Sequence, residues 1–335
     1  MIRVRFAPSP TGSLHIGNAL SAVANRGFGD WLLLRIDDTD PARNVPCGEE
    51  GVLEDLRWLG VGWDDGPARQ SARAARHLEA ARAAGLPQRF EGVMLWRDDD
   101  SPTFHLASVV DDADFGITHV IRGSDHQPNE ELHAALHRAL GSIPPQVIHH
   151  GLVVGADGKK LSKRAEGATV ASLREAGYPA EAVHAYLEEL GLPRHDVHYD
   201  LQRIRSLSVG QLAELDDAEL AARAGVPVEA AALMRGAHDL VEARSLAHTV
   251  LDPPDPARNR LLRSPETLGR FVELRAELPD VLDKDAAKSV VRELKAVGGS
   301  LKALRVALTG QEHGPELWAV LRALPRDEAL RRALP

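Results

Sequence analysis

Two kinds of apolar pattern alternate at the start of the chain, and this alternation constrains the fold more than any other feature. Residues 2–7 (IRVRFA) alternate apolar and charged side chains, and 31–36 (WLLLRI) form a continuous apolar run; both are typical of strands. Apolar residues recur at helical spacing from near His15 and again over 49–60. Strand, helix, strand and helix in this order predict a parallel α/β sheet with right-handed crossovers.

The rest of the chain repeats this pattern once and then becomes helical. A second α/β half is expected from 102 onward, and residues 71–101 join the two halves through one helix rich in Ala and Arg. Helical patterns dominate from about 168, and three prolines at 253, 254 and 256 indicate a linker. We predict a Rossmann-like parallel-sheet domain at 1–165, a helical connecting domain at 166–250 and a helical domain at 251–335.

Composition excludes several classes of protein. The single cysteine, Cys47, excludes an intramolecular disulfide and a cysteine-rich zinc site. No apolar run has membrane-spanning length, and the N-terminus lacks the apolar core of a signal peptide, so we expect a cytoplasmic enzyme without a membrane partner. Residues 1–240 carry 24 Lys and Arg against 35 Asp and Glu, whereas 241–335 carry 16 against 14. This mildly basic last third permits phosphate contacts but does not demand them.

The loop after the first strand carries a candidate anion site. Ligands of parallel α/β sheets bind where loops lead into helix N-termini, whose unpaired N–H groups and dipole favour phosphate. Gly12 and Gly17 would allow close approach of a ligand, and His15 can donate a hydrogen bond to a phosphate oxygen. An isolated His-x-Gly is more often a capped helix with a surface histidine, so that alternative stays open.

A second candidate element lies at 155–164 (GADGKKLSKR). An Asp-Gly turn precedes four cations there, namely Lys159, Lys160, Lys163 and Arg164. A basic loop can neutralise charge on a departing pyrophosphate, which requires positioning rather than proton transfer. It is not a Walker loop, because Val153 stands where the upstream glycine would be. A solvated turn or a nucleic-acid patch would have the same composition.

Taken together, these segments resemble the successive signature blocks of class I glutamyl-tRNA synthetases. The blocks are RFAPSPTGSLHIG, LLRIDDTDPAR, LRWLGVGWDDGP, VVDDADFGITHVIRGSDH and GKKLSKRAEGATV, in the family's order. Residues 301–317 also resemble the C-terminal anticodon-binding region of the bacterial enzymes. The resemblance covers nearly the whole chain, more loosely between about 240 and 300.

The resemblance implies a two-step reaction. ATP and L-glutamate form glutamyl-adenylate with release of pyrophosphate, and the glutamyl group then passes to the 3′-terminal ribose of tRNA. Mg²⁺ is expected with ATP, and zinc is not. The residues expected to stabilise phosphate charge are His15, Lys160 and Lys163. Those expected around ATP are Ser9, Thr11, His15, Gly17, Asn18, Lys160, Leu161, Ser162 and Lys163. Those expected around glutamate are Arg5, Ala7, Ser9, Asp37, Phe104, Ser108 and Arg122.

Three positions of the amino-acid site depart from the family pattern. Asp37 stands where the family usually has Glu and would bind the α-ammonium; the related glutaminyl enzymes also have Asp there. Phe104 replaces the usual Tyr and so lacks a hydroxyl, and Ser108 stands where some members have Asn. One lost hydrogen bond of this kind costs about 0.5–1.5 kcal/mol, which lowers affinity without abolishing binding.

A larger departure is a deletion. Family members insert a domain between the two sheet halves that guides the tRNA acceptor end, and here only 71–101 remain. The C-terminal helical part is also short, and three arginines are candidates for reading the anticodon, although a solvated helix arginine is the expected role of each: Arg305, Arg322 and Arg326.

The sequence therefore favours a compact, monomeric glutamate–tRNA ligase that uses a glutamate-accepting tRNA; whether a glutamine-accepting tRNA also serves stays open. One alternative is a glutamyl-adenylate enzyme with another acceptor, such as the queuosine base of a tRNA, which residues 264–335 disfavour. The other is a non-catalytic tRNA-binding paralogue, which the intact His15 and lysine loop disfavour.

Overall fold

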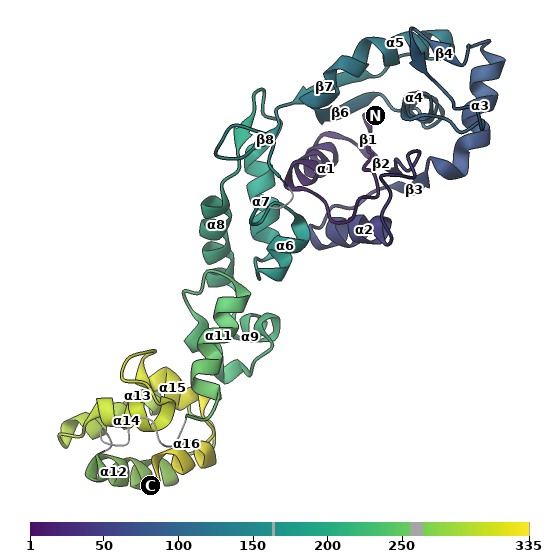
Figure 1. The fold of residues 1–335 in the computed structure, drawn as a ribbon. Helices are drawn as coiled ribbons and strands as arrows, with labels where there is room; N and C mark the ends of the chain where they lie inside the picture. Colours follow the sequence, from purple (N-terminus) through teal and green to yellow (C-terminus); the bar gives the residue numbers. More distant parts are fainter. Residues whose placement is uncertain (163–164, 255–263, 335) are drawn as a thin grey trace. The chain divides into compact units, whose positions relative to one another are not determined.

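The computed structural model describes residues 1–162, 165–254 and 264–334 (Figure 1). Their contacts group them into two compact units, Met1–Glu175 with Ala180–Leu207 and Ala176–Pro179 with Ser208–Pro335. The boundaries predicted at 165 and 250 stay predictions. Lys163, Arg164 and Pro256 lie outside the described residues.

The first unit is the α/β part of the chain. Its strands are β1 (Arg3–Phe6), β2 (Trp31–Ile36), β3 (Asp65–Arg69), β4 (Arg89–Phe90), β5 (Val93–Met94), β6 (His119–Gly123), β7 (Gln146–His150), β8 (Val153–Val154) and β9 (Val197–His198). Its α-helices are α1 (Ile16–Phe28), α2 (Gly48–Trp58), α3 (Ala74–Ala83), α4 (Phe104–Asp114), α5 (Glu130–Ala139), α6 (Val170–Glu175), α7 (Ala180–Leu190) and α8 (Leu201–Glu214), the last of which continues into the second unit.

Parallel pairing dominates the sheet. β1, β2 and β3 pair in parallel, with Val4 opposite Leu32, and β6 pairs in parallel with β7. The two parts meet beside β1, where the Thr118 amide donates to the Arg3 carbonyl at 2.9 Å. Figure 1 shows β1 between β2 and β6, so the loop after β1 leaves from the middle of the sheet. The predicted parallel α/β class is confirmed.

The connector between the two sheet halves is small but packed. It contains α3 and a short antiparallel hairpin of β4 and β5. Ala81, Leu86 and Leu95 from this segment are buried in one cluster with residues of α4 and α5. The expected Ala/Arg-rich helix is therefore present, and the hairpin was not foreseen because its strands have two residues each.

Two further strands also went unpredicted. β3 has the sequence DGPAR, which contains Gly and Pro and no apolar alternation, and β9 has only two residues. Each is defined by backbone pairing with a partner that is distant in sequence, β2 for the former and β8 for the latter. Local patterns carry no information about such pairing.

The second unit is helical. After α8 it contains α9 (Asp217–Ala224), α10 (Ala231–Met234), α11 (Leu240–Leu251), α12 (Pro265–Ala276), α13 (Lys284–Ala296), α14 (Leu301–Thr309), α15 (Leu317–Ala323) and α16 (Arg326–Ala333). One apolar cluster runs through it, and Phe271 is fully buried in that cluster. Within the described part of the chain, every helix is too short or too polar to cross a bilayer.

Candidate active site

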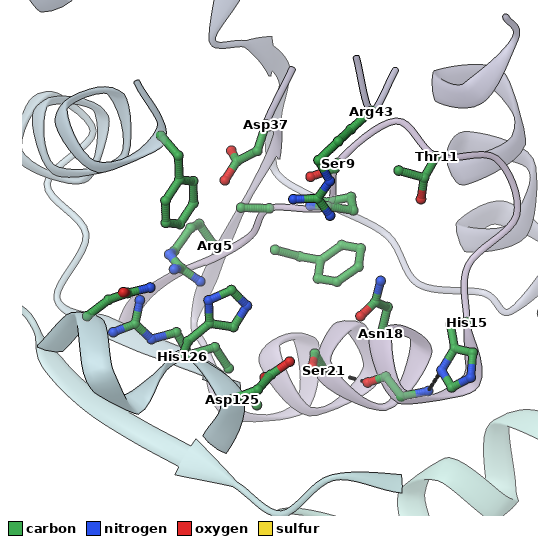
Figure 2. A pocket seen from close by; sticks show the side chains of 18 of the residues that line it. Arg5, Ser9, Thr11, His15, Asn18, Ser21, Asp37, Arg43, Asp125 and His126 are labelled. Carbon is green, nitrogen blue, oxygen red and sulfur yellow. Dashed lines mark hydrogen bonds between the residues drawn. The ribbon is translucent and has the colours of Figure 1, made fainter. Parts of the chain in front are cut away.

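A cavity of about 710 Å³ lies beyond the carboxyl ends of β1, β2 and β6. Its wall comes from the segments that follow these strands, from the starts of α1 and α4, from the end of β7 and the start of β8, and from Arg97 and Lys160. Figure 2 shows Arg5 and Asp37 toward one end of the cavity and Thr11 and His15 toward the other. This is the place at which parallel α/β sheets bind ligands.

Most of the predicted site residues line this one cavity. Those that do are Arg5, Ala7, Ser9, Thr11, His15, Gly17, Asn18, Asp37, Phe104, Arg122 and Lys160. Three described residues, Ser108, Leu161 and Ser162, are not part of its wall. Lys163 lies outside the described residues. The individual role of each residue stays a prediction.

His15 is the N-cap of α1. Its Nδ1 accepts a hydrogen bond from the Gly17 amide at 3.1 Å, and the ring is only 9% exposed. The predicted helix start is therefore confirmed. Because this bond orients the ring, the histidine lies at the cavity wall in a defined position.

The expected unpaired backbone donors are not found at this helix start. The Ile16 amide donates to the Ala168 carbonyl at 2.9 Å, and the Asn18 amide donates to the His15 carbonyl at 2.8 Å. With Gly17 bonded to the His15 ring, the first three amides of α1 are all engaged. An anion here would therefore meet side chains and the helix dipole rather than these amides.

Backbone pairing also brings the lysine loop to this helix start. The Ile16 bond to Ala168 is joined by a bond from the Val170 amide to the Leu14 carbonyl at 2.9 Å, so the segment after the loop pairs with the segment before α1. From the loop, Nζ of Lys160 donates to Oδ2 of Asp125, which follows β6, at 2.6 Å. Lys160 remains 63% exposed, so its charge stays largely hydrated.

A buried carboxylate on α2 fixes the loop that carries His15. Oδ2 of Asp55 accepts from the Ser13 hydroxyl at 2.6 Å and from the Leu14 amide at 2.7 Å. At the start of α2, a Cβ on Gly48 would lie 2.1 Å from the Pro10 carbonyl oxygen, so only glycine fits this close approach. Neither Asp55 nor Gly48 was singled out from the sequence.

The amino-acid end of the cavity rests on buried charges. Nε and Nη2 of Arg35 donate to the two carboxylate oxygens of Asp37 at 2.7 and 3.2 Å. Nη1 of Arg35 donates to Asp112 at 2.8 Å, and Asp112 also lies 3.6 Å from Nε of Arg5. Arg35 is fully buried and is not part of the cavity wall.

Burial and charge shift the ionisation of these groups. Burial lowers the pKa of Arg5, against the attraction of Asp112, and raises the pKa of Asp37, against the attraction of Arg35. Burial alone would lower the pKa of Arg35, but Asp37 and Asp112 raise it above its usual value. Burial, together with the charge of Arg5, lowers the pKa of Arg122 to about 10.

An aromatic wall with three histidines adjoins Arg122. Phe104 contacts the rings of His105, His126 and His133, and Nδ1 of His105 lies 3.1 Å from Nε2 of His133. Burial and the charge of Arg122 lower the pKa of His133 to about 2, so its ring is neutral near pH 7.

Ser108 lies behind this wall. It is 2% exposed, and its hydroxyl accepts from Nη2 of Arg35 at 3.3 Å. The contact of Ser108 with substrate stays a prediction. His105, three positions earlier in the chain, lines the cavity, whereas Ser108 does not.

Two of the residues that sequence reasoning missed carry a shared signal. Arg35 and Asp112 are charged residues at the ends of apolar runs, WLLLRI and ASVVDD. A charge that is buried on such a segment requires an opposite charge nearby. A charged residue at the end of an apolar run therefore indicates that an oppositely charged partner exists, but not which residue that partner is.

No metal centre is indicated by the described side chains: no group of three or more His, Cys, Asp and Glu among them could hold a metal ion. Mg²⁺ is expected with the nucleotide rather than on a protein cage. The expectation of no zinc stays a prediction.

The three arginines considered for anticodon recognition are engaged within the second unit. Arg322 lies 3.4 Å from Asp217, Arg326 lies 3.4 Å from Asp327, and the Arg305 guanidinium donates to the Pro315 carbonyl. A role in reading the anticodon would require these contacts to be exchanged for contacts to RNA.

Comparison with known proteins identifies the family. The model of the class I tRNA synthetases (E and Q), catalytic domain, matches residues 1–84 and 82–209. Glutamate–tRNA ligase 1 of Rubrobacter xylanophilus is 35% identical, with 99% of this chain and 96% of the relative covered. The glutamate–tRNA ligase of Synechococcus is 31% identical, with 97% of this chain and 96% of the relative covered.

This chain is shorter than these relatives, and the difference in length lies within the aligned region. These two alignments span 426 and 462 positions, although this chain has 335 residues and is covered almost completely. The family match breaks at 82–84, within the connector 71–101. The relatives thus contain residues that have no counterpart here.

A solved structure shows the same fold. The glutamate tRNA ligase of Elizabethkingia meningosepticum, solved in complex with its amino acid, matches with a TM-score of 0.74 at 22% identity and covers 99% of this chain and 98% of that chain. The family match, the relatives above 30% identity and this fold agree. The chain belongs to the class I tRNA synthetases of the glutamate and glutamine branch.

Proposed function

We propose that the chain attaches glutamate to the 3′ end of tRNA in an ATP-dependent reaction with a glutamyl-adenylate intermediate. The observation that carries this proposal is the one cavity in which Arg5 and Asp37 lie toward one end and His15 lies toward the other, with Lys160 also in its wall. Opposite charges at the first end suit an amino acid with an acidic side chain. The hydrogen-bonding His15 and the basic Lys160 suit phosphate.

The amino-acid end would recognise glutamate through charge. The Arg5 guanidinium can pair with the side-chain carboxylate in a bidentate manner, and Arg122 adds a second cation at the cavity wall. The Asp37 carboxylate can accept a hydrogen bond from the α-ammonium group. Because Arg35 holds both oxygens of Asp37, the ammonium would share an acceptor that is already oriented.

At the other end the groups would act on ATP bound with Mg²⁺. His15 can donate a hydrogen bond to the α-phosphate, and Lys160 can stabilise charge on the leaving pyrophosphate. The ion pair of Lys160 with Asp125 keeps the lysine near the cavity before the nucleotide binds. These roles require positioned charge and no proton transfer by either residue.

Helix α13 in the second unit supports tRNA as the acceptor. Four exposed cations follow one another at helical spacing along it: Lys284, Lys288, Arg292 and Lys295. None of them forms an ion pair within the described residues, and Lys284 and Lys288 lie 5.0 and 5.7 Å from the Trp318 ring centroid. Exposed cations without an ion pair can contact the phosphates of RNA. We expect a monomer that charges glutamate tRNA.

The test is ATP–pyrophosphate exchange with Glu, Gln and Asp, each with and without total tRNA. Exchange that occurs with Glu but not with Gln or Asp, and only when tRNA is present, supports the ligase if labelled glutamate is then transferred to tRNA. Exchange without tRNA moves the assignment to another acceptor. The absence of exchange with every amino acid contradicts the proposal. Purified glutamine-accepting tRNA as acceptor tests whether that tRNA is also charged.

A further inference from the structure

Four side chains of alternating charge form a row beside the amino-acid end of the cavity: Arg5, Asp112, Arg35 and Asp37. Oδ1 of Asp112 lies 3.6 Å from Nε of Arg5 and accepts from Nη1 of Arg35 at 2.8 Å. Arg35 then holds both oxygens of Asp37. One carboxylate oxygen therefore lies between two guanidinium groups.

Only the two ends of this row line the cavity. Arg5 and Asp37 belong to the cavity wall, whereas Arg35 and Asp112 do not. The side chains of Arg35 and Asp112 are 0% and 5% exposed, so water cannot replace a contact that either of them loses. Arg35 and Asp112 therefore cannot touch a bound amino acid. The distance between the Arg5 guanidinium and the Asp37 carboxylate nevertheless depends on them.

We propose that Asp112 is a positioning residue, which sets the separation of the Arg5 guanidinium and the Asp37 carboxylate and thereby the preference for an amino acid of matching length. This inference rests on the proposed function. Without the charge of Asp112, Arg5 and Arg35 repel each other across the gap, since each is buried and cationic. Arg5 then shifts toward solvent in the cavity, and Arg35 loses one of the contacts that orient Asp37.

The neighbouring residue provides a matched control. Asp111 is equally buried on the same helix, but its Oδ1 accepts from Nε of Arg73 at 2.7 Å and lies 2.8 Å from Nε2 of His77. Arg73 and His77 belong to the connector 71–101 and do not line the cavity. Asp111→Asn thus removes a buried carboxylate charge and its longer-range attraction for Arg35, but no hydrogen bond or ion pair of the row.

The experiment compares wild type, Asp112→Asn and Asp111→Asn by ATP–pyrophosphate exchange in the presence of tRNA, with Glu, Asp and Gln as substrates. In Asp112→Asn we expect the KM for Glu to rise about tenfold and the preference for Glu over Asp and Gln to shrink, with the KM for ATP unchanged. Asp111→Asn should lose thermal stability but keep the KM for Glu and the preference.

Glutamate binding is measured separately by the rise in melting temperature that added glutamate produces. If Asp112→Asn does not fold, Asp112→Glu retains the charge with one more methylene and should raise the KM for Glu with less loss of stability. Equal KM values and preferences in wild type and the Asp112 variants overturn the inference while the proposed function stands. A wild type that neither exchanges nor binds glutamate overturns the proposed function itself.

Discussion

The two ends of the cavity are built in different ways. At the amino-acid end, Arg5 and Asp37 are joined through the buried Asp112 and Arg35, and their geometry is set before any ligand binds. Of the residues proposed to act on the nucleotide, Lys160 is 63% exposed and forms an ion pair with Asp125. The His15 ring, in contrast, is oriented by a hydrogen bond from the Gly17 amide.

This difference matches what each end has to do. Selecting one small amino acid among similar ones requires fixed distances, which buried charges provide because nothing else can compensate for a displaced partner. Neutralising the charge of a departing pyrophosphate requires a cation that can follow the phosphate, and an exposed lysine provides it. Substitutions should therefore affect substrate selection at the first end and rate at the second.

The largest effect is expected at the amino-acid end. If Arg5 binds the substrate carboxylate as proposed, Arg5→Ala removes two charge-assisted hydrogen bonds, so kcat/KM for Glu should fall about a thousandfold, or about 4 kcal/mol. Arg3→Ala on the same strand is the control, since Arg3 stacks on Trp31 and is not part of the cavity wall. Similar kcat/KM values for the two variants in pyrophosphate exchange would contradict the assignment.

His15 should give the next largest effect, and on rate. Asn caps helices as well as His15 does here, so His15→Asn should keep the fold while lowering kcat about a hundredfold through loss of a contact to the phosphate. His15→Ala should in addition lower stability by about 1 kcal/mol. Single-turnover adenylate formation measures the rate, and a wild-type rate in His15→Asn would remove His15 from the mechanism.

A smaller effect is expected for the exposed lysine. Lys160→Ala should lower kcat about tenfold, and the difference from wild type should shrink as salt rises, because exposed charges are screened. Lys159→Ala changes the neighbouring exposed lysine, which is not part of the cavity wall, and should leave kcat within about twofold. Equal rates for both variants at low salt would show that the loop acts by net charge alone.

The smallest effect concerns pH and the aromatic wall. Burial lowers the pKa of His133 to about 2, whereas the unfolded chain takes up a proton at this residue below about pH 6.5. The unfolded state then binds more protons, so stability falls as pH drops below 6.5, by at most about 1.4 kcal/mol between pH 7.5 and 5.5 for this residue. His105 and His126 act in the same direction.

Melting curves at the two pH values measure this effect. The melting temperature of wild type should fall more between pH 7.5 and 5.5 than that of His133→Gln, which retains a hydrogen-bonding side chain next to His105. An identical fall in both proteins would mean that the ring is protonated in the folded state.

Much of this protein could be predicted from sequence alone. The strand at 31–36 was predicted with its observed bounds, the helix start at His15 was correct, and the residues expected in the ATP and glutamate sites mostly line one cavity. The strand and the helix start depend on patterns within a few residues, whereas the site residues were implied by the motifs that the chain shares with the synthetase family. Such signals are present in the chain before it folds.

Other features were decided only by the tertiary structure. The pairing of β3 with β2, the anchoring of the His15 loop by Asp55 and the row from Arg5 to Asp37 all join residues that are far apart in the chain. Arg35 and Asp112 are separated by 77 positions, and nothing in either local sequence names the other. The sequence determined which charges are present at the buried ends of strands and helices. Folding determined which of them neutralise each other, because the free energy of a buried charge depends on the groups within a few ångströms of it and not on its neighbours in the chain.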